Sequence, residues 1–187
     1  MKKYYFVLFG MLSLSVAHAA PEVLLKNQLN INGVVVGSAC SVVIESGASR
    51  GGVIDFGQYN QNQRSGGVSK LFFVKLFENN AATPGCSAFL AGSGLVSLAF
   101  GDASSKQLDE RGVITKGAGD NIRIAISSTD TGKVNNQKII TSQNNVLKYP
   151  QEFASKGMFG FNAKAEGLDD ASSGSYHGSL SLVVSYK

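Results

Sequence analysis

The chain has 187 residues, which is enough for one domain with a sizeable hydrophobic core. Charged residues make up only 16% of it, and the chain has 17 basic and 13 acidic residues. This composition argues against a disordered chain and gives no sign of a partner that is held by charge.

The N-terminus predicts a signal for export. Lys2 and Lys3 precede an apolar run over residues 4–16, and the small-residue motif Ala-His-Ala follows at 17–19. Cleavage after this motif makes residues 1–19 the signal peptide. The run is too short to span a bilayer, so a membrane anchor is the weaker interpretation. Removing the two lysines leaves a nearly balanced charge, which does not favour a nucleic-acid partner.

Residues 20–36 precede the first cysteine and predict an amphipathic strand. A strand with one apolar face and no hairpin partner must bury that face against another part of a protein. The residues on its more apolar face are Leu25, Asn27, Leu29, Ile31 and Gly33, and the polar face carries Lys26, Gln28, Asn30 and Asn32.

The two cysteines, Cys40 and Cys86, have only each other as candidate partners. Export places them in an oxidising compartment, which favours a disulfide. Closing the loop between them contributes roughly 4 kcal/mol in the chain-entropy picture. Two free buried thiols remain the alternative.

Residues 37–187 carry repeated period-two alternation and predict short strands joined by turn-rich connectors. Residues 71–77 are apolar on both faces, which predicts a strand that is buried on both sides. One apolar face is expected for 96–100, 122–126 and 159–165, and one turn of helix is expected within 149–156. The pattern favours an all-β sandwich of immunoglobulin type, although the tryptophan of that fold is missing.

The last residues predict a strand whose apolar alternation runs to the penultimate position. Leu180, Leu182, Val184 and Tyr186 share one face, and Lys187 follows them. A strand in this position raises the question of which segment pairs with it and covers its apolar face.

Catalytic chemistry is not indicated. After removal of the signal peptide, His177 is the remaining histidine, and it is expected in a solvated turn without a second histidine or a cluster of carboxylates. The acid pairs Asp109–Glu110 and Asp169–Asp170 are expected on surface loops. No nucleophile elbow, phosphate-binding loop or dinucleotide fingerprint occurs in the sequence. We therefore expect no enzyme, no metal, no cofactor and no small-molecule substrate.

Taken in order along the chain, these segments resemble the pilin subunits of the chaperone–usher pathway, the type 1 and P pilus family. The matching segments follow the signal peptide as LNINGVVVGSAC, FFVKLFE, VSLAFGD, NIRIAISSTDTG, FGFNAKAEG and GSYHGSLSLVVSYK. The resemblance spans the whole mature chain, with residues 20–36 as the N-terminal extension and 37–187 as the pilin domain.

The resemblance implies an incomplete immunoglobulin-like sandwich that lacks its last strand. In this family a periplasmic chaperone lends a strand to the resulting groove, and the arm of the next subunit replaces it in the fibre. The residues implied for the donor strand are Leu25, Asn27, Leu29, Ile31 and Gly33. Those implied for the groove and for chaperone binding are Leu180, Leu182, Val184, Tyr186 and the carboxylate of Lys187.

The implied partners are a periplasmic pilus chaperone, an outer-membrane usher and neighbouring pilin subunits. The implied location is a pilus on the cell surface, reached through the periplasm, where the subunit contributes to bacterial adhesion. Departures from the family pattern at Asn27 and between Leu76 and Cys86 favour a minor subunit. A single-domain sugar-binding adhesin and a self-complemented secreted β-sandwich are the alternatives.

Overall fold

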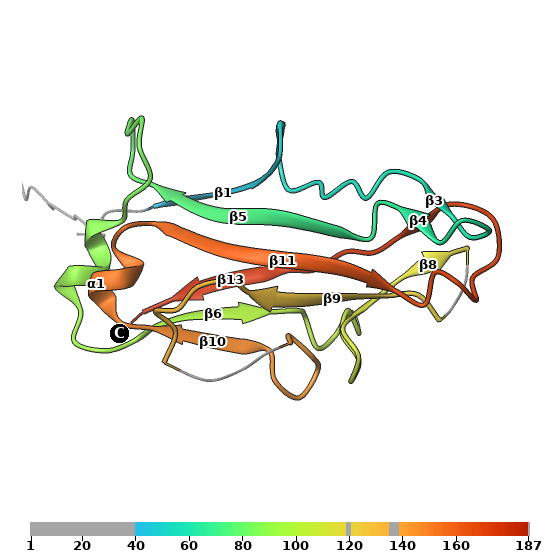
Figure 1. Cartoon of the computed structure of the whole chain (residues 1–187). Helices are drawn as coiled ribbons and strands as arrows, with labels where there is room; N and C mark the ends of the chain where they lie inside the picture. The colour runs from blue at the N-terminus through green and yellow to red at the C-terminus, as the bar shows by residue number, and fades with distance from the viewer. Residues whose placement is uncertain (1–39, 119–120, 135–138, 187) are drawn as a thin grey trace, which may run out of the picture. The chain divides into compact units, whose positions relative to one another are not determined.

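The computed structural model describes residues 40–118, 121–134 and 139–186 (Figure 1). The predicted signal peptide, the predicted arm and Lys187 lie outside these residues. The elements in chain order are β1 (Ser41–Ser46), β2 (Ser49–Arg50), β3 (Tyr59–Asn60), β4 (Ser65–Gly66), β5 (Ser69–Phe77), the 3₁₀ helix η1 (Ser87–Ala91), β6 (Val96–Phe100), β7 (Val113–Ile114), β8 (Lys116–Gly117), β9 (Arg123–Ser128), β10 (Val146–Tyr149), α1 (Gln151–Ala154), β11 (Met158–Glu166), β12 (Tyr176–His177) and β13 (Leu182–Ser185).

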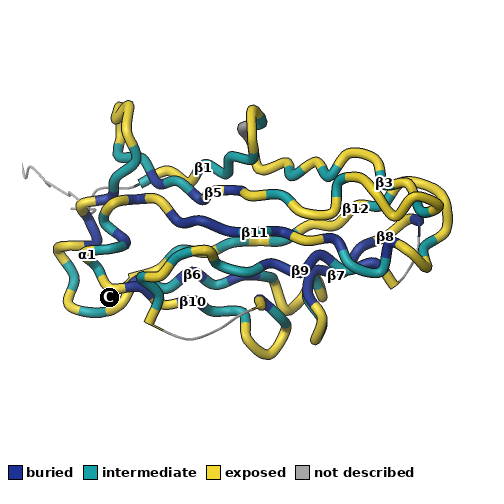
Figure 2. Tube along the Cα trace, in the orientation of Figure 1, coloured by how far each residue is buried: buried dark blue, intermediate teal, exposed yellow. Residues whose placement is uncertain are grey.

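The larger sheet has six strands in the order β2-β1-β5-β11-β9-β7, and neighbouring strands are antiparallel. Alternate residues of the long strand β11 are buried, as the period-two pattern of 159–165 predicts. The expected inward face of 122–126 is likewise confirmed, because Ile122, Ile124 and Ile126 are all buried. This face forms one side of the core, as the dark blue stretches in Figure 2 show.

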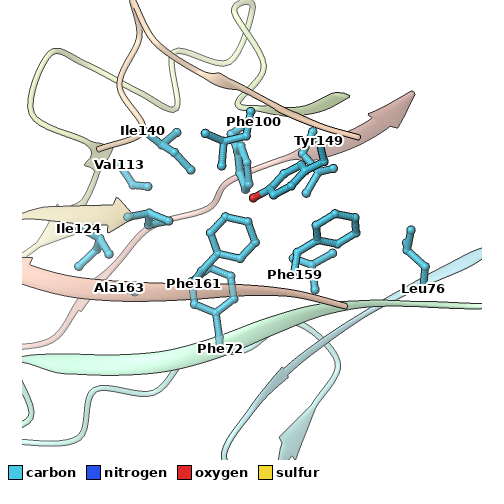
Figure 3. Packing of buried hydrophobic residues seen from close by; sticks show 14 of the residues in the cluster. Phe72, Leu76, Phe100, Val113, Ile124, Ile140, Tyr149, Phe159, Phe161 and Ala163 are labelled. Carbon is cyan, nitrogen blue, oxygen red and sulfur yellow. The ribbon is translucent and has the colours of Figure 1, made fainter. Parts of the chain in front are cut away.

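The smaller sheet has the order β10-β6-β13 and supplies the other side of the core. Val96, Leu98 and Phe100 of β6 are buried, as predicted. The ring of Phe161 in the larger sheet lies 5.4 Å from that of Phe100 in an edge-on contact and 5.2 Å from that of Phe72 (Figure 3). Two sheets that share one apolar interior make up the predicted all-β sandwich.

The prediction that residues 71–77 are buried on both faces is wrong. Phe72, Val74 and Leu76 of β5 are buried, but Leu71 is 60% exposed and Phe73 is 39% exposed on the other face. The smaller sheet covers only the inner face of β5. Phe73 stands opposite Gly160 of β11, where its ring takes up part of the space that the glycine leaves open.

Tyr149 brings a hydroxyl into the core, and this group links the two sheets. Its oxygen lies 3.2 Å from Ser128 Oγ and donates over 3.3 Å to Asp130 Oδ2, while Asp130 Oδ1 accepts the Gly160 N–H over 3.0 Å. Burial raises the pKa of Tyr149 far above its usual value, and it also raises the pKa of the Asp130 carboxyl. The polar group is therefore satisfied where β9 and β10 end and β11 begins.

The disulfide between Cys40 and Cys86 is present, with 5.9 Å between the two Cα atoms. It ties the residue before β1 to the residue before η1. The short helix expected within 149–156 is α1, whereas η1 was not predicted. The disulfide therefore holds the first strand of the domain next to a helical connection between the two sheets.

Replacing Cys40 or Cys86 with Ser is expected to lower the free energy of unfolding by about 4 kcal/mol, because the loop between them is then unconstrained in the unfolded chain. Urea titration of the variants measures this loss. Thr83→Ala changes an exposed residue of the loop before Cys86, so it is the matched control and should change little. A loss below about 1 kcal/mol in both cysteine variants contradicts this role.

Candidate functional site

The last strand, β13, lies at an edge of the smaller sheet. It pairs antiparallel with β6, and no other described strand pairs with it. The register places Leu182 opposite Phe100 and Val184 opposite Leu98. One long edge of β13 is therefore unoccupied by any described strand.

The hydrogen-bond pattern shows which backbone groups face this free edge. The Gly101 N–H donates to the Ser181 carbonyl over 2.8 Å, so Ser181 belongs to the set of residues that bond with β6. In an antiparallel ladder, alternate residues direct both backbone groups to the same neighbour. The N–H and C=O groups of Leu182 and Val184 therefore point away from β6, towards the free edge.

The side chains of the same strand divide into an inner and an outer face. Leu180, Leu182 and Val184 are half-buried and pack against the core. Val183, on the outer face, is 58% exposed. The structure thus places these three predicted groove residues together, on the side that faces the larger sheet.

The end of the predicted groove is more open. Tyr186 is 42% exposed, and its ring makes an edge-on contact with Phe89 of η1 at 5.1 Å between centroids. Lys187, the last predicted groove residue, lies outside the described residues, as do all five predicted donor-strand residues.

Residues 53–58, for which no role was predicted from the sequence, lie close to Tyr176, shortly before the last strand. Ile54 and Phe56 are partly buried and pack against the core, although residues 53–58 form no strand. The ring of Phe56 lies 6.4 Å from that of Tyr176 in β12. Ile54 and Phe56 alternate with the exposed Val53 and Asp55, so a short period-two signal was present.

Groups with catalytic potential are dispersed over the described residues. His177 lies exposed in β12, paired with Lys116 of β8, and not in the turn that the sequence suggested. Asp109 forms an ion pair with Arg123 at 2.5 Å, and Asp169 accepts the hydroxyl of Tyr59 over 2.6 Å. Among the described residues, no group of three or more His, Cys, Asp or Glu side chains could hold a metal ion. No helix in these ranges is long and apolar enough to cross a membrane.

Comparisons with known proteins agree with this arrangement. A family model described as K88 fimbrial protein A matches residues 1–187. No curated protein matches the chain. Among solved structures, the crystal structure of the P pilus rod subunit PapA is similar, with a TM-score of 0.52 and 18% sequence identity over 87% of this chain and 100% of that chain. The likeness supports an immunoglobulin-like sandwich.

Proposed function

The chain belongs to the K88 fimbrial protein A family, and from this premise we propose that donor-strand exchange joins it to its neighbours in the fibre. It is a structural subunit of a pilus on the cell surface, and it associates with other pilin subunits. Its role is structural, because it connects neighbouring subunits in the fibre. We assign it no catalytic activity.

The free edge of β13 is the observation that carries this proposal. The backbone groups of Leu182 and Val184 face away from β6, and their side chains are only half-buried. Unpaired strand edges with apolar faces are unfavourable in water and favour the addition of another strand. An added strand would form hydrogen bonds with these backbone groups and would cover the half-buried side chains. This mode of recognition is called β-strand addition.

In the fibre, the arm of a neighbouring subunit would pair with the free edge of β13. The arm of this chain would pair with the corresponding edge of another neighbour. The apolar residues of the arm are Leu25, Leu29 and Ile31. Burying three such side chains gives roughly 5–9 kcal/mol before the cost of ordering the arm. Before assembly, a strand from a periplasmic chaperone occupies the same edge, and an outer-membrane usher is the site of exchange.

Co-expression with a periplasmic chaperone of this pathway tests the proposal. A stable one-to-one complex is expected, and without the chaperone the subunit should be degraded or should aggregate, because its free edge stays unpaired. Co-purification and size-exclusion chromatography measure the complex. If the full chain is instead a folded, thermally stable monomer without any chaperone, the proposal is wrong and the chain completes its own sandwich.

A further inference from the structure

The outer face of the larger sheet carries large apolar side chains that remain exposed to solvent. Leu71 and Phe73 lie on this face of β5, and Met158 of the adjacent strand β11 is 48% exposed. The register places Gly160 opposite Phe73, so Met158 is a diagonal neighbour of the Phe73 ring. We call Leu71, Phe73 and Met158 the outer patch.

The outer patch contributes little to the core of the domain. The buried side chains of β5 and β11 are on the inner face of the sheet. An exposed strand position also accepts a polar β-branched residue such as threonine, so folding alone does not explain three large apolar residues there. Neighbouring exposed apolar side chains commonly mark a contact surface.

Two ion pairs accompany the outer patch. Lys75 pairs with Glu45, and Lys164 pairs with Glu166 over 3.3 Å. The strand register places all four side chains on the outer face of the larger sheet. Because each pair contains one charge of either sign, an identical face meets no net repulsion. A lysine of one copy can then approach a glutamate of the other.

Strand addition at β13 leaves the outer patch accessible. β13 belongs to the smaller sheet, and the outer patch is on the side of the larger sheet that faces away from the core. A strand that pairs with β13 extends the smaller sheet and does not cross the larger one. The outer patch is therefore free both in the chaperone complex and in the fibre.

The size of the outer patch determines what kind of contact it can make. Three side chains of this size, each about half exposed, present on the order of 300 Å² of apolar surface. A stable complex buries about 800 Å² on each partner. One patch is thus too small to hold two isolated subunits together, whereas a contact that repeats along a fibre gains strength from every repeat.

Symmetry determines where the partner patch lies. A patch that pairs with itself requires a two-fold axis. Successive subunits of one fibre point in the same direction and are not related by such an axis, so the partner patch belongs to another fibre. We propose that the outer patch binds the outer patch of an identical subunit in a second fibre, so that the two fibres lie side by side. This proposal rests on assembly into a fibre, and it requires the subunit to repeat along the fibre, which a minor subunit does not.

A bead-aggregation experiment tests the outer patch without requiring fibre assembly. Streptavidin-coated beads carry the full mature chain, biotinylated at its N-terminus, in its chaperone complex or as the free chain. We expect the wild-type beads to aggregate, and the double variant Leu71→Thr with Phe73→Thr to lower the aggregated fraction at least about fivefold, because dense display makes a weak contact effective. Since the patch is apolar and the nearby charges are paired, about 0.5 M NaCl should not disperse the aggregates.

Val183→Thr is the matched control, because it alters an exposed apolar side chain on the outer face of the smaller sheet and should leave aggregation unchanged. Met158→Gln should also lower aggregation, which keeps the test decisive if the double variant does not fold. The proposal is overturned if wild-type beads stay dispersed. It is also overturned if the outer-patch variants aggregate like the wild type, or if Val183→Thr disperses the beads to the same extent.

Electron microscopy of pili assembled from this subunit gives a second measurement. We expect bundles for the wild type and single fibres for the double variant. A change in the coiling of single fibres without any loss of bundles would instead place the contact within one fibre and overturn the proposal. If no pili form while the beads still aggregate, donor-strand exchange is wrong and the outer patch remains a self-association surface.

Discussion

Replacing Val184 with Asp is expected to abolish incorporation of this subunit into pili. Val184 is half-buried on the face of β13 that packs against the core, and its backbone groups face the free edge. Any strand added along that edge would enclose the new carboxylate without a partner. Burying an unpaired charge costs several kcal/mol, which offsets most of the roughly 5–9 kcal/mol expected from an inserted strand.

Val183→Asp is the matched control. Val183 is the adjacent residue of the same strand, but its side chain is 58% exposed on the outer face. The added charge there remains in water, so incorporation should stay close to that of the wild type. Immunoblots of purified pili, normalised to the subunit in the periplasm, give the ratio. If both variants are incorporated equally, the free edge of β13 is not the place where the arm of a neighbouring subunit binds.

The inward faces of the sandwich were predictable from the sequence because they follow a simple period. Phe159 and Phe161 alternate with small or polar residues in β11, and that alternation determines which face is buried. The same reasoning failed at Leu71 and Phe73, because both faces of β5 are apolar. Which of them is covered depends on where the second sheet lies, and local sequence does not contain that information.

The candidate site was predictable in part. The alternation of Leu182 and Val184 predicted the last strand and its inner face, but that this strand lacks a neighbour followed only from the family resemblance. Ile54 and Phe56 were missed because two apolar residues between glycine-rich turns give a weak signal. The hydrogen bond between Tyr59 and Asp169 joins residues that are 110 positions apart in sequence, so no local pattern could have indicated it.

The second large effect concerns the arm. Replacing Ile31 with Asp is expected to prevent this subunit from being attached to the neighbour that should receive its arm, while its own complex with the chaperone remains intact. Ile31 lies on the same face of the predicted strand as Leu29, and insertion would bury both. The register is strict, because a slip of one residue would exchange the apolar face for the one that carries Lys26, Gln28 and Asn30.

Asn30→Asp is the matched control, since it introduces the same carboxylate on the opposite face of the arm, where it should be tolerated. Displacement of the chaperone from a second subunit by a synthetic peptide of residues 23–33 measures the difference. The peptide that carries Ile31→Asp is expected to act at least about tenfold more slowly than the peptide that carries Asn30→Asp.

A self-complemented sandwich makes the opposite prediction. In that case Ile31→Asp would lower the thermal stability of the isolated chain, because the arm would cover its own β13. If instead the variant has unchanged stability and loses only its attachment to the neighbour, the arm acts between subunits.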